Sequence, residues 1–481
     1  MAKIYKVPGV YIEEVNKFPS TIVPVETAIP AFMGRTEYAI DIMGKDIFPV
    51  SGKLPIPTRI TSFQEYQKHF GGANTENDIF SNTGMPNIID TLVENKLTNR
   101  VITCTPKSDL LSGAYLYYAI QMFYANGGGP CYIVSSGNYN SAFNNEAGQS
   151  CLDAIAKMDE PTILIFTDKH ADCGTISGYK ELYDQALVQC NNFRDRIAIF
   201  DPWILSDKPS DDLALFRSDI GMQHLKYGCV YYPWLKSTLS YHIDESLVKV
   251  KHSVGVENGI LDSKSLTDIK TIDLDAYLVI KEEINKITIN LPPSSTVAGI
   301  MNRVDNNRGV WKASANEQIN LVFGPTFRLT DAQQQIFNID PTTGKSVNAI
   351  IFATGKRTLI WGARTLLGND NEWRYISIVR FFNFVEESLK KGTEFVVFEP
   401  NDANTWIKIK SMCENFLNQL WRQGALQGIK PNNAFYVRVG LGSTMTSLDI
   451  LEGRIKIEIG MAVVRPAEFV ILKISHKMQE S

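Results

Sequence analysis

The segment FVVFEPNDANTWIKIKSMCENFLNQLWRQG, residues 395–424, decides how the C-terminal part of the chain folds. Its Glu-Pro-Asn-Asp at 399–402 provides short polar side chains that accept the unpaired N–H groups of a helix start. Apolar side chains then recur at steps of three and four, as on a helix with one buried face; they are Trp406, Ile409, Cys413, Phe416 and Leu420. Gly424 stands where a C-terminal cap belongs. The pattern predicts an amphipathic helix, preceded by a short strand at 395–398.

Further elements surround this helix. A helix is expected at 381–390, and strands are expected at 435–439 and at 454–459, where charged residues alternate with isoleucine as in a half-exposed strand. Residues 469–474 (FVILKI) are apolar on both faces. A strand of this kind at a chain end must be covered from both sides. We therefore expect another chain to complete this region.

Composition narrows the class of protein. The chain has 481 residues, enough for two or three domains, and a net charge of −4, which gives no electrostatic reason to expect nucleic acid or a membrane surface as a partner. Its seven cysteines show no C-x-x-C spacing and predict reduced thiols and assembly in a cytoplasm. No signal peptide and no run as long as a membrane span is seen, so a soluble protein without direct membrane insertion is expected.

The N-terminal residues 1–27 read as an extended arm. Val10, Tyr11 and Ile12 have the β-branched and aromatic character of a strand, and Pro19 and Pro24 isolate that strand from the rest of the chain. Without a local hairpin partner, its backbone hydrogen bonds must be made elsewhere in the fold or with another subunit.

The middle of the chain, residues 28–354, reads as α/β. Strands are expected at 28–34, 131–134, 162–166, 196–200, 229–232 and 348–352, separated by helical segments, and this alternation predicts a parallel sheet. Residues 237–291 contain more Lys, Asp and Ser and few aromatic residues, so they are expected to form a surface insertion.

The motifs in this region that could indicate a catalytic, phosphate-binding or metal site are weak. Asn-Gly-Gly-Gly at 126–129 precedes a strand instead of coming after one, so it reads as a flexible helix stop. Thr-Gly-Lys-Ser at 343–346 lacks the leading glycine of a phosphate loop, so it reads as a turn. The six histidines have no zinc-site spacing, and no G-x-S-x-G elbow occurs. Asp168 and its neighbours after a strand leave an α/β hydrolase-like or nucleotide-binding enzyme as the alternative. No catalytic, cofactor-binding or metal-binding residue is predicted.

Several blocks of sequence, in order, resemble the tail sheath proteins of contractile phage tails and contractile injection systems. They are PGVYIEE at 8–14, TSF at 61–63, FGG at 70–72, NGGGPCY at 126–132, YYPW at 231–234, Gly299, Asp305, RGVWK at 308–312, WGART at 361–365, WRY at 373–375, FVEES at 384–388, FEPND at 398–402 and VRPAEF at 464–469. The segment 237–291 departs from the pattern, being longer than the link expected there.

The resemblance implies a structural sheath subunit, not an enzyme. Such subunits polymerise into a helical tube of stacked rings around an inner tube protein and drive it through a target envelope on contraction, with baseplate and tail-terminator proteins as further partners and no nucleic acid. It implies an α+β inner domain made of 1–27 and 355–481, with α/β outer domains inserted at 28–354. The particle would be a virion tail or a phage tail-like particle, assembled in the cytoplasm and released from the cell.

Specific residues are implied by this resemblance. The arm strands donated to neighbouring subunits would be Val10, Tyr11 and Ile12 at one end and Phe469, Val470, Ile471, Leu472 and Ile474, within a strand at 468–475, at the other. The polar helix face Lys408, Ser411, Asn415 and Arg422 is proposed to meet the inner tube, because its opposite face belongs to the core. Gly460 is expected to act as a hinge before the last strand, since glycine adopts backbone angles closed to other residues.

Overall fold

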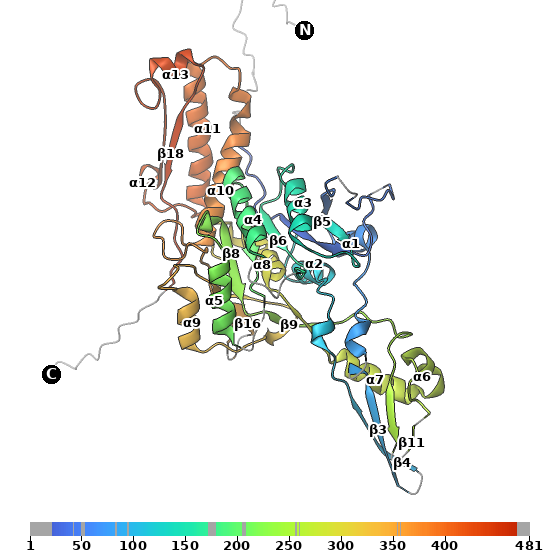
Figure 1. The fold of residues 1–481 in the computed structure, drawn as a ribbon. Helices are drawn as coiled ribbons and strands as arrows, with labels where there is room; N and C mark the ends of the chain where they lie inside the picture. Colours follow the sequence, from blue (N-terminus) through green and yellow to red (C-terminus); the bar gives the residue numbers. More distant parts are fainter. Residues whose placement is uncertain are drawn as a thin grey trace, which may run out of the picture. The chain divides into compact units, whose positions relative to one another are not determined.

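The computed structural model describes residues 22–41, 43–49, 53–81, 84–93, 96–171, 179–203, 208–254, 257–258, 260–353, 355 and 357–468 (Figure 1). The chain divides into two compact units. The smaller unit contains residues 1–25 and 385–464, and the larger unit contains residues 26–384 and 465–481.

A nine-stranded sheet organises the larger unit, in the order β13-β16-β15-β8-β7-β6-β1-β5-β2. Its strands are β1 (Pro30–Thr36), β2 (Thr58–Ile60), β5 (Cys131–Asn138), β6 (Ile163–Phe166), β7 (Ile197–Phe200), β8 (Gly228–Tyr232), β13 (Glu317–Gln318), β15 (Asn348–Phe352) and β16 (Thr358–Ile360). The six strands from β15 to β5 run parallel, and β2, β13 and β16 pair antiparallel at the two edges. The predicted parallel sheet is confirmed.

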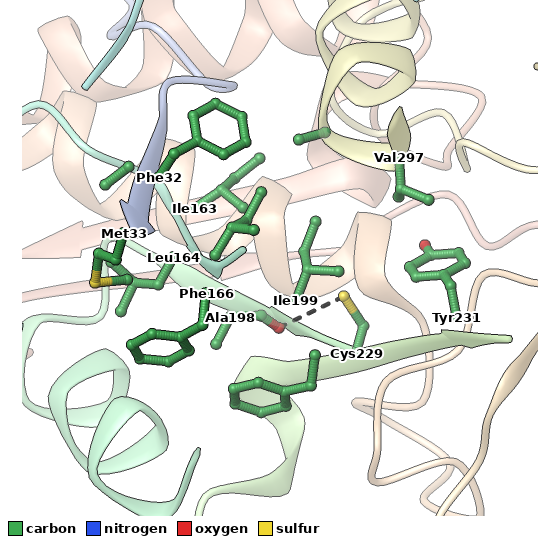
Figure 2. Packing of buried hydrophobic residues seen from close by; sticks show 14 of the residues in the cluster. Phe32, Met33, Ile163, Leu164, Phe166, Ala198, Ile199, Cys229, Tyr231 and Val297 are labelled. Atoms are coloured by element: carbon green, nitrogen blue, oxygen red, sulfur yellow. Dashed lines mark hydrogen bonds between the residues drawn. The ribbon is translucent and has the colours of Figure 1, made fainter. Parts of the chain in front are cut away.

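The parallel strands are buried on both faces, which explains their continuous apolar runs. Successive side chains alternate across the sheet, so Figure 2 shows Phe32 and Val297 on one side of the strands and Phe166 on the other. The helices α2 (Leu116–Ala125) and α8 (Ser294–Arg308) pack together, as do α3 (Asn145–Ile155) and α4 (Lys180–Phe193). The Phe32 ring meets Phe123 of α2, and the Phe166 ring stacks on Tyr183 of α4.

A second hydrophobic core lies in the larger unit. The sheet β11-β10-β3-β4 consists of β3 (Asn87–Val93), β4 (Lys96–Thr103), β10 (Lys251–Val254) and β11 (Glu257–Asn258), and its core includes residues from α6 (Leu266–Ile272) and α7 (Leu274–Asn285). Ile88 and Ile102 pair across β3 and β4 and are buried with Ile269 and Ile280. Residues 237–291 therefore supply most of a core, which residues 79–102 complete. The Lys-, Asp- and Ser-rich composition had suggested only a surface insertion.

The remaining elements of the larger unit frame these two cores. They are the sheet β9 (Leu235–Ser240), β12 (Thr288–Leu291) and β14 (Val322–Pro325), the helices α1 (Phe63–Phe70), α5 (Pro209–Asp219) and α9 (Asp331–Asn338), and the 3-10 turns η1 (Asn77–Phe80), η3 (Ser108–Leu110) and η4 (Leu225–Tyr227). The helix stop expected at 126–129 is confirmed, since α2 ends at Ala125 and Gly127 lies in a turn; a second turn, at 341–343, leads into Gly344.

The smaller unit is built from helices and one hairpin. Its elements are the end of α10 (Ile376–Thr393), η5 (Glu394–Val396), α11 (Ala403–Arg422), α12 (Pro431–Ala434), β17 (Phe435–Val439), α13 (Ser447–Leu451) and β18 (Ile457–Met461). The strand predicted at 395–398 is wrong. The chain makes a 3-10 turn there, and Phe398 takes a positive φ of 71° with its side chain exposed, so no strand pairing is possible.

Candidate assembly surfaces

Helix α11 is the frame of the smaller unit. Its N-terminus is capped as predicted, because the Asp402 carboxylate accepts the N–H of Thr405 at 2.9 Å. Its C-terminus is followed by Gly424 with φ of 86°, which lets the chain turn away. One stripe is buried, comprising Ile409, Met412, Cys413, Phe416, Leu417 and Leu420. The other side of the helix is exposed in this unit.

That other side carries the predicted polar face. Lys408, Ser411, Asn415 and Arg422 are all exposed, and Asn418 between them is half-buried. The Lys408 ammonium lies 4.3 Å from the centroid of the Phe395 ring, a cation–π contact that holds one of the two cations of this face in place. The structure thus brings the four predicted residues onto one exposed face of α11.

The hairpin β17–β18 is a sheet of two strands within the described residues. Phe435 pairs with Met461 at one end and Val439 with Ile457 at the other. Val437 is buried, whereas the Tyr436 hydroxyl and Glu458 join on the exposed face by a hydrogen bond of 2.8 Å. Each strand has one outer edge not paired to another named strand, and such an edge accepts an added strand.

The predicted strand at 454–459 is shifted. β18 begins only at Ile457, because Arg454 and Lys456 turn back to Asp449 of α13. The Lys456 ammonium lies 2.8 Å from Asp449 Oδ1, and this contact, with the Thr446 cap, holds the pKa of Asp449 well below its usual range. Two of the three charged positions in the alternating pattern therefore serve α13 instead of the hairpin.

Gly460 does not have the conformation expected of a hinge. It lies within β18, directly opposite Tyr436, and its φ is not positive. A Cβ at this position would collide with the Tyr436 ring. The glycine is needed for this close approach, which gives it a packing role in the hairpin, and its action as a hinge stays a prediction.

The predicted arm residues Val10, Tyr11, Ile12, Phe469, Val470, Ile471, Leu472 and Ile474 lie outside the described residues. The described chain starts at Ile22, whose buried side chain packs on Gly392 in the smaller unit. The N–H of Val25 donates to Ser388 Oγ of α10 at 3.2 Å. The described end of the predicted arm is therefore held against α10.

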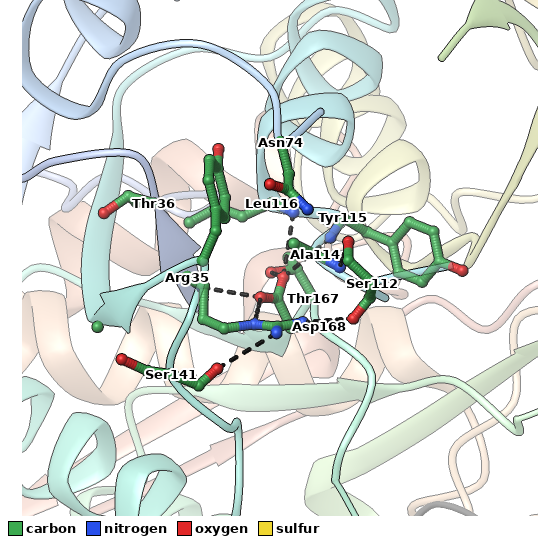
Figure 3. Close-up of polar contacts among 12 residues, drawn as sticks. Arg35, Thr36, Asn74, Ser112, Ala114, Tyr115, Leu116, Ser141, Thr167 and Asp168 are labelled. Carbon is green, nitrogen blue, oxygen red and sulfur yellow. Dashed lines mark hydrogen bonds and ion pairs between the residues drawn. The ribbon is translucent and has the colours of Figure 1, made fainter. Parts of the chain in front are cut away.

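The enzyme alternative was tied to Asp168, at the end of β6. Sheet order places β1 between β5 and β6, so the β1/β6 ends form the crevice where α/β folds bind ligands. Figure 3 shows this place filled by the protein itself. Asp168 Oδ2 accepts the N–H and Nε–H of Arg35 at 2.8 and 3.0 Å, and Oδ1 accepts the N–H groups of Tyr115 and Leu116 at 3.1 Å each. The carboxylate anchors the start of α2 and is saturated.

Asp201, after β7, is a second buried carboxyl. Its Oδ1 accepts the N–H of Ser294 at 3.1 Å, and its Oδ2 has no hydrogen-bond partner among the described residues. Burial raises the pKa of Asp201 to about 7. It lines a small pocket with Tyr183, Trp203 and Phe216. Sequence reasoning missed this residue, and an Asp directly after a buried strand was the available signal.

Other site types find little support in the part of the chain that the structure describes. No group of three or more His, Cys, Asp or Glu there could hold a metal ion. No helix there is both long and apolar enough to cross a membrane. The six described cysteines are free thiols, and all but Cys104 are buried.

Comparison with known proteins identifies the fold. A model of the phage tail sheath C-terminal domain matches residues 368–477. Along nearly its whole length the chain is similar to the sheath of the PVC extracellular contractile injection system in the contracted state, with 26% identity, a TM-score of 0.64 and 99% of each chain covered. The chain is thus similar to contractile sheath proteins along nearly its whole length, and its residues 368–477 match the phage tail sheath C-terminal domain.

Two further sheath proteins are similar. The contracted helical sheath of the anti-feeding prophage is 26% identical, with a TM-score of 0.63, covering 98% of this chain and 100% of that one. The tail sheath protein of Burkholderia phage BcepMu is 28% identical over 149 residues, which are 29% of this chain and only 30% of that relative. These sheath proteins are structural components, and the mixed α/β fold of this chain is theirs.

Proposed function

We propose that this chain polymerises into a helical sheath around an inner tube and drives that tube through a target envelope by contracting. The observation that carries the proposal is the likeness, over 99% of the chain, to a sheath captured in its contracted state. Head-to-tail contacts between identical subunits do not close on themselves, so they generate an open helical polymer. Residues 1–27 and 355–481 are proposed to form the inner domain, with residues 28–354 outside it.

The proposed link between subunits is strand donation. The outer edges of β17 and β18 are suited to accept Val10–Tyr11–Ile12 of one neighbour and residues 469–474 of another. Each added backbone hydrogen bond contributes roughly 1 kcal/mol net, and each buried apolar side chain adds roughly 1.5–3 kcal/mol before ordering costs. An arm held in this way remains attached while weaker polar contacts between subunits rearrange.

The face Lys408, Ser411, Asn415 and Arg422 is proposed to meet the inner tube, which its exposure permits. Baseplate proteins are proposed as partners at one end of the sheath, since a similar chain, 27% identical, occurs in the baseplate of the anti-feeding prophage. A tail-terminator protein is proposed at the other end. Assembly would take place in the cytoplasm, before release of the particle.

Electron microscopy of negatively stained material tests this function. The chain is co-expressed with an inner tube protein of the same contractile system and, as a control, expressed alone. Long striated tubes of extended or contracted diameter are the expected result. A monodisperse monomer in both preparations would reject the sheath function.

A further inference from the structure

The last described residue, Glu468, is held by a set of contacts within the larger unit. Arg364 donates to both carboxylate oxygens, from Nε to Oε1 at 2.8 Å and from the terminal Nη2 to Oε2 at 2.6 Å. Asn338 Nδ2 donates to Oε1 at 3.1 Å, and the Tyr375 hydroxyl donates to Oε2 at 3.2 Å. Each carboxylate oxygen thus accepts two hydrogen bonds.

The Arg364 fork is also held by contacts that do not involve Glu468. The residue is 3% exposed, and its third nitrogen, Nη1, donates to the carbonyl of Gly368 at 3.1 Å. Its backbone N–H donates to Asn348 Oδ1 at 2.7 Å, while Asn348 Nδ2 donates to the Arg364 carbonyl at 2.8 Å. A planar guanidinium held in this way selects a carboxylate by shape as well as by charge.

Two other features restrict the same short segment. Arg465 donates from Nη1 to the carbonyl of Asn371 at 2.8 Å, and Pro466 fixes one backbone angle between the two anchored residues. Burial opposes the charge of Glu468, but the donors of Arg364, Asn338 and Tyr375 outweigh it and hold the pKa of Glu468 below its ordinary value. The carboxylate is therefore charged and bound at neutral pH.

We propose that Arg364 and Glu468 form a clamp that fixes where the C-terminal segment leaves the subunit, so that residues 469–481 reach a second copy of this chain from a set starting point. Arg364 and Glu468 are positioning residues in this role. The proposal rests on the proposed strand donation by that segment. It also places the last anchored residue at Glu468, beyond Gly460, where a hinge was expected.

The first test measures anchoring without assembly. A nitroxide is attached through Ala467→Cys in a Cys104→Ser, Cys173→Ser background, and its mobility is recorded in non-assembled full-length chain. Glu468→Gln should convert a mainly immobile spectrum into a mainly mobile one, because the charge-assisted bonds to Arg364 are lost. Glu282→Gln, which removes an exposed carboxylate of α7 in the same unit, is the matched control and should leave the spectrum unchanged. A spectrum unaltered by Glu468→Gln would overturn the clamp.

The second test measures assembly. Glu468→Gln should lower the yield of sheath tubes by about tenfold relative to Glu282→Gln, and Arg364→Lys, which keeps the charge but loses the fork, should fall between them. A mobile label with a normal tube yield would overturn the positioning role. Tubes formed normally by a chain lacking residues 469–481 would instead reject strand donation, and the mobility result would still stand.

Discussion

The larger and the smaller unit differ in how far their sheets are buried. In the larger unit the parallel strands are buried on both faces, and buried ion pairs join Asp305 to Arg380 and Asp168 to Arg35. In the smaller unit a two-stranded hairpin leaves Tyr436 and Ile457 partly exposed, and Phe398 is fully exposed. The main sheet of the larger unit is covered on both faces, whereas the hairpin of the smaller unit has the features of a sheet that further strands complete.

The largest effect is expected from removing the N-terminal arm, which is proposed to complete the hairpin of a neighbouring subunit. Deletion of residues 1–19 should abolish tubes while leaving the melting temperature of the monomer nearly unchanged, because the arm is proposed to pack on another subunit. Microscopy and calorimetry measure the two effects. The matched variant keeps the full length but replaces Val10, Tyr11 and Ile12 by serine, and it should also fail to assemble. Intact tubes from either variant would contradict donation at this end.

Breaking a buried ion pair should damage the larger unit. Arg380 Nη1 lies 3.1 Å from Asp305 Oδ1, and Thr27 Oγ1 donates to Oδ2 at 2.6 Å, with both charged side chains almost fully buried. Asp305→Ala should lower the free energy of unfolding by about 3–5 kcal/mol, since it leaves a buried guanidinium unpaired.

The matched control for Asp305 is Glu458→Ala. It breaks the exposed pair with Arg438 in the hairpin and should cost only about 0–1 kcal/mol. Urea unfolding compares the two variants. Equal losses would show that the two units do not differ in how they are stabilised.

Asp201 should make the stability of the larger unit depend on pH. Its pKa rises from 3.8 to about 7 in the folded chain, so the folded state binds the proton more tightly than the unfolded state. Its contribution to stability is complete below pH 3.8 and is lost as the pH rises through 7, at up to roughly 1.4 kcal/mol per pH unit.

Asp201→Asn should remove this slope, which makes the variant more stable than the parent at pH 8 but not at pH 4. Melting temperatures across that range measure it. Asp153→Asn, at an exposed position of α3, is the control and should leave the slope in place. A parent chain whose stability is flat between pH 4 and 7 would refute a raised pKa for Asp201.

The polar face of α11 should show the smallest effect. Reversing charge in Lys408→Glu with Arg422→Glu should weaken co-sedimentation of tube with sheath several-fold and change its dependence on salt, because exposed charges are screened. The fold should tolerate both changes, since both side chains are exposed. Lys410→Glu, on the same helix beside Glu414, is the control. Unchanged co-sedimentation would show that this face does not contact the inner tube.

Much of the fold could be predicted from local pattern. The strands β6, β7 and β8 are apolar runs between helices, and the cap at Asp402 is a short-range signal, so neither depends on distant residues. The same reasoning gave a wrong strand at residues 395–398, where Val397 and Phe398 are exposed and Phe395 and Val396 are half-buried in a 3-10 turn. Apolarity alone does not distinguish a strand from a surface that meets another chain.

Contacts between residues far apart in the sequence could not be predicted from local pattern. Arg364 and Glu468 each stood within a block that resembled the sheath family, yet their contact joins residues more than a hundred positions apart. The second core combines residues 79–102 with 237–291, and its polar composition concealed the apolar positions Ile269 and Ile280. The exposure of the α11 face could be predicted, since its opposite side is a periodic buried stripe.

The open edges of the hairpin have a consequence for how a sheath stops growing. If each subunit completes its sheet with strands from its neighbours, every filament ends in subunits whose edges are still vacant. A filament grows at those ends. Its length then depends on whether a new subunit or a terminating protein with a matching strand binds the unpaired edge first. A free peptide with the sequence of residues 8–14 would then act as a chain terminator, shortening sheaths in proportion to its concentration without touching subunits already buried in the lattice.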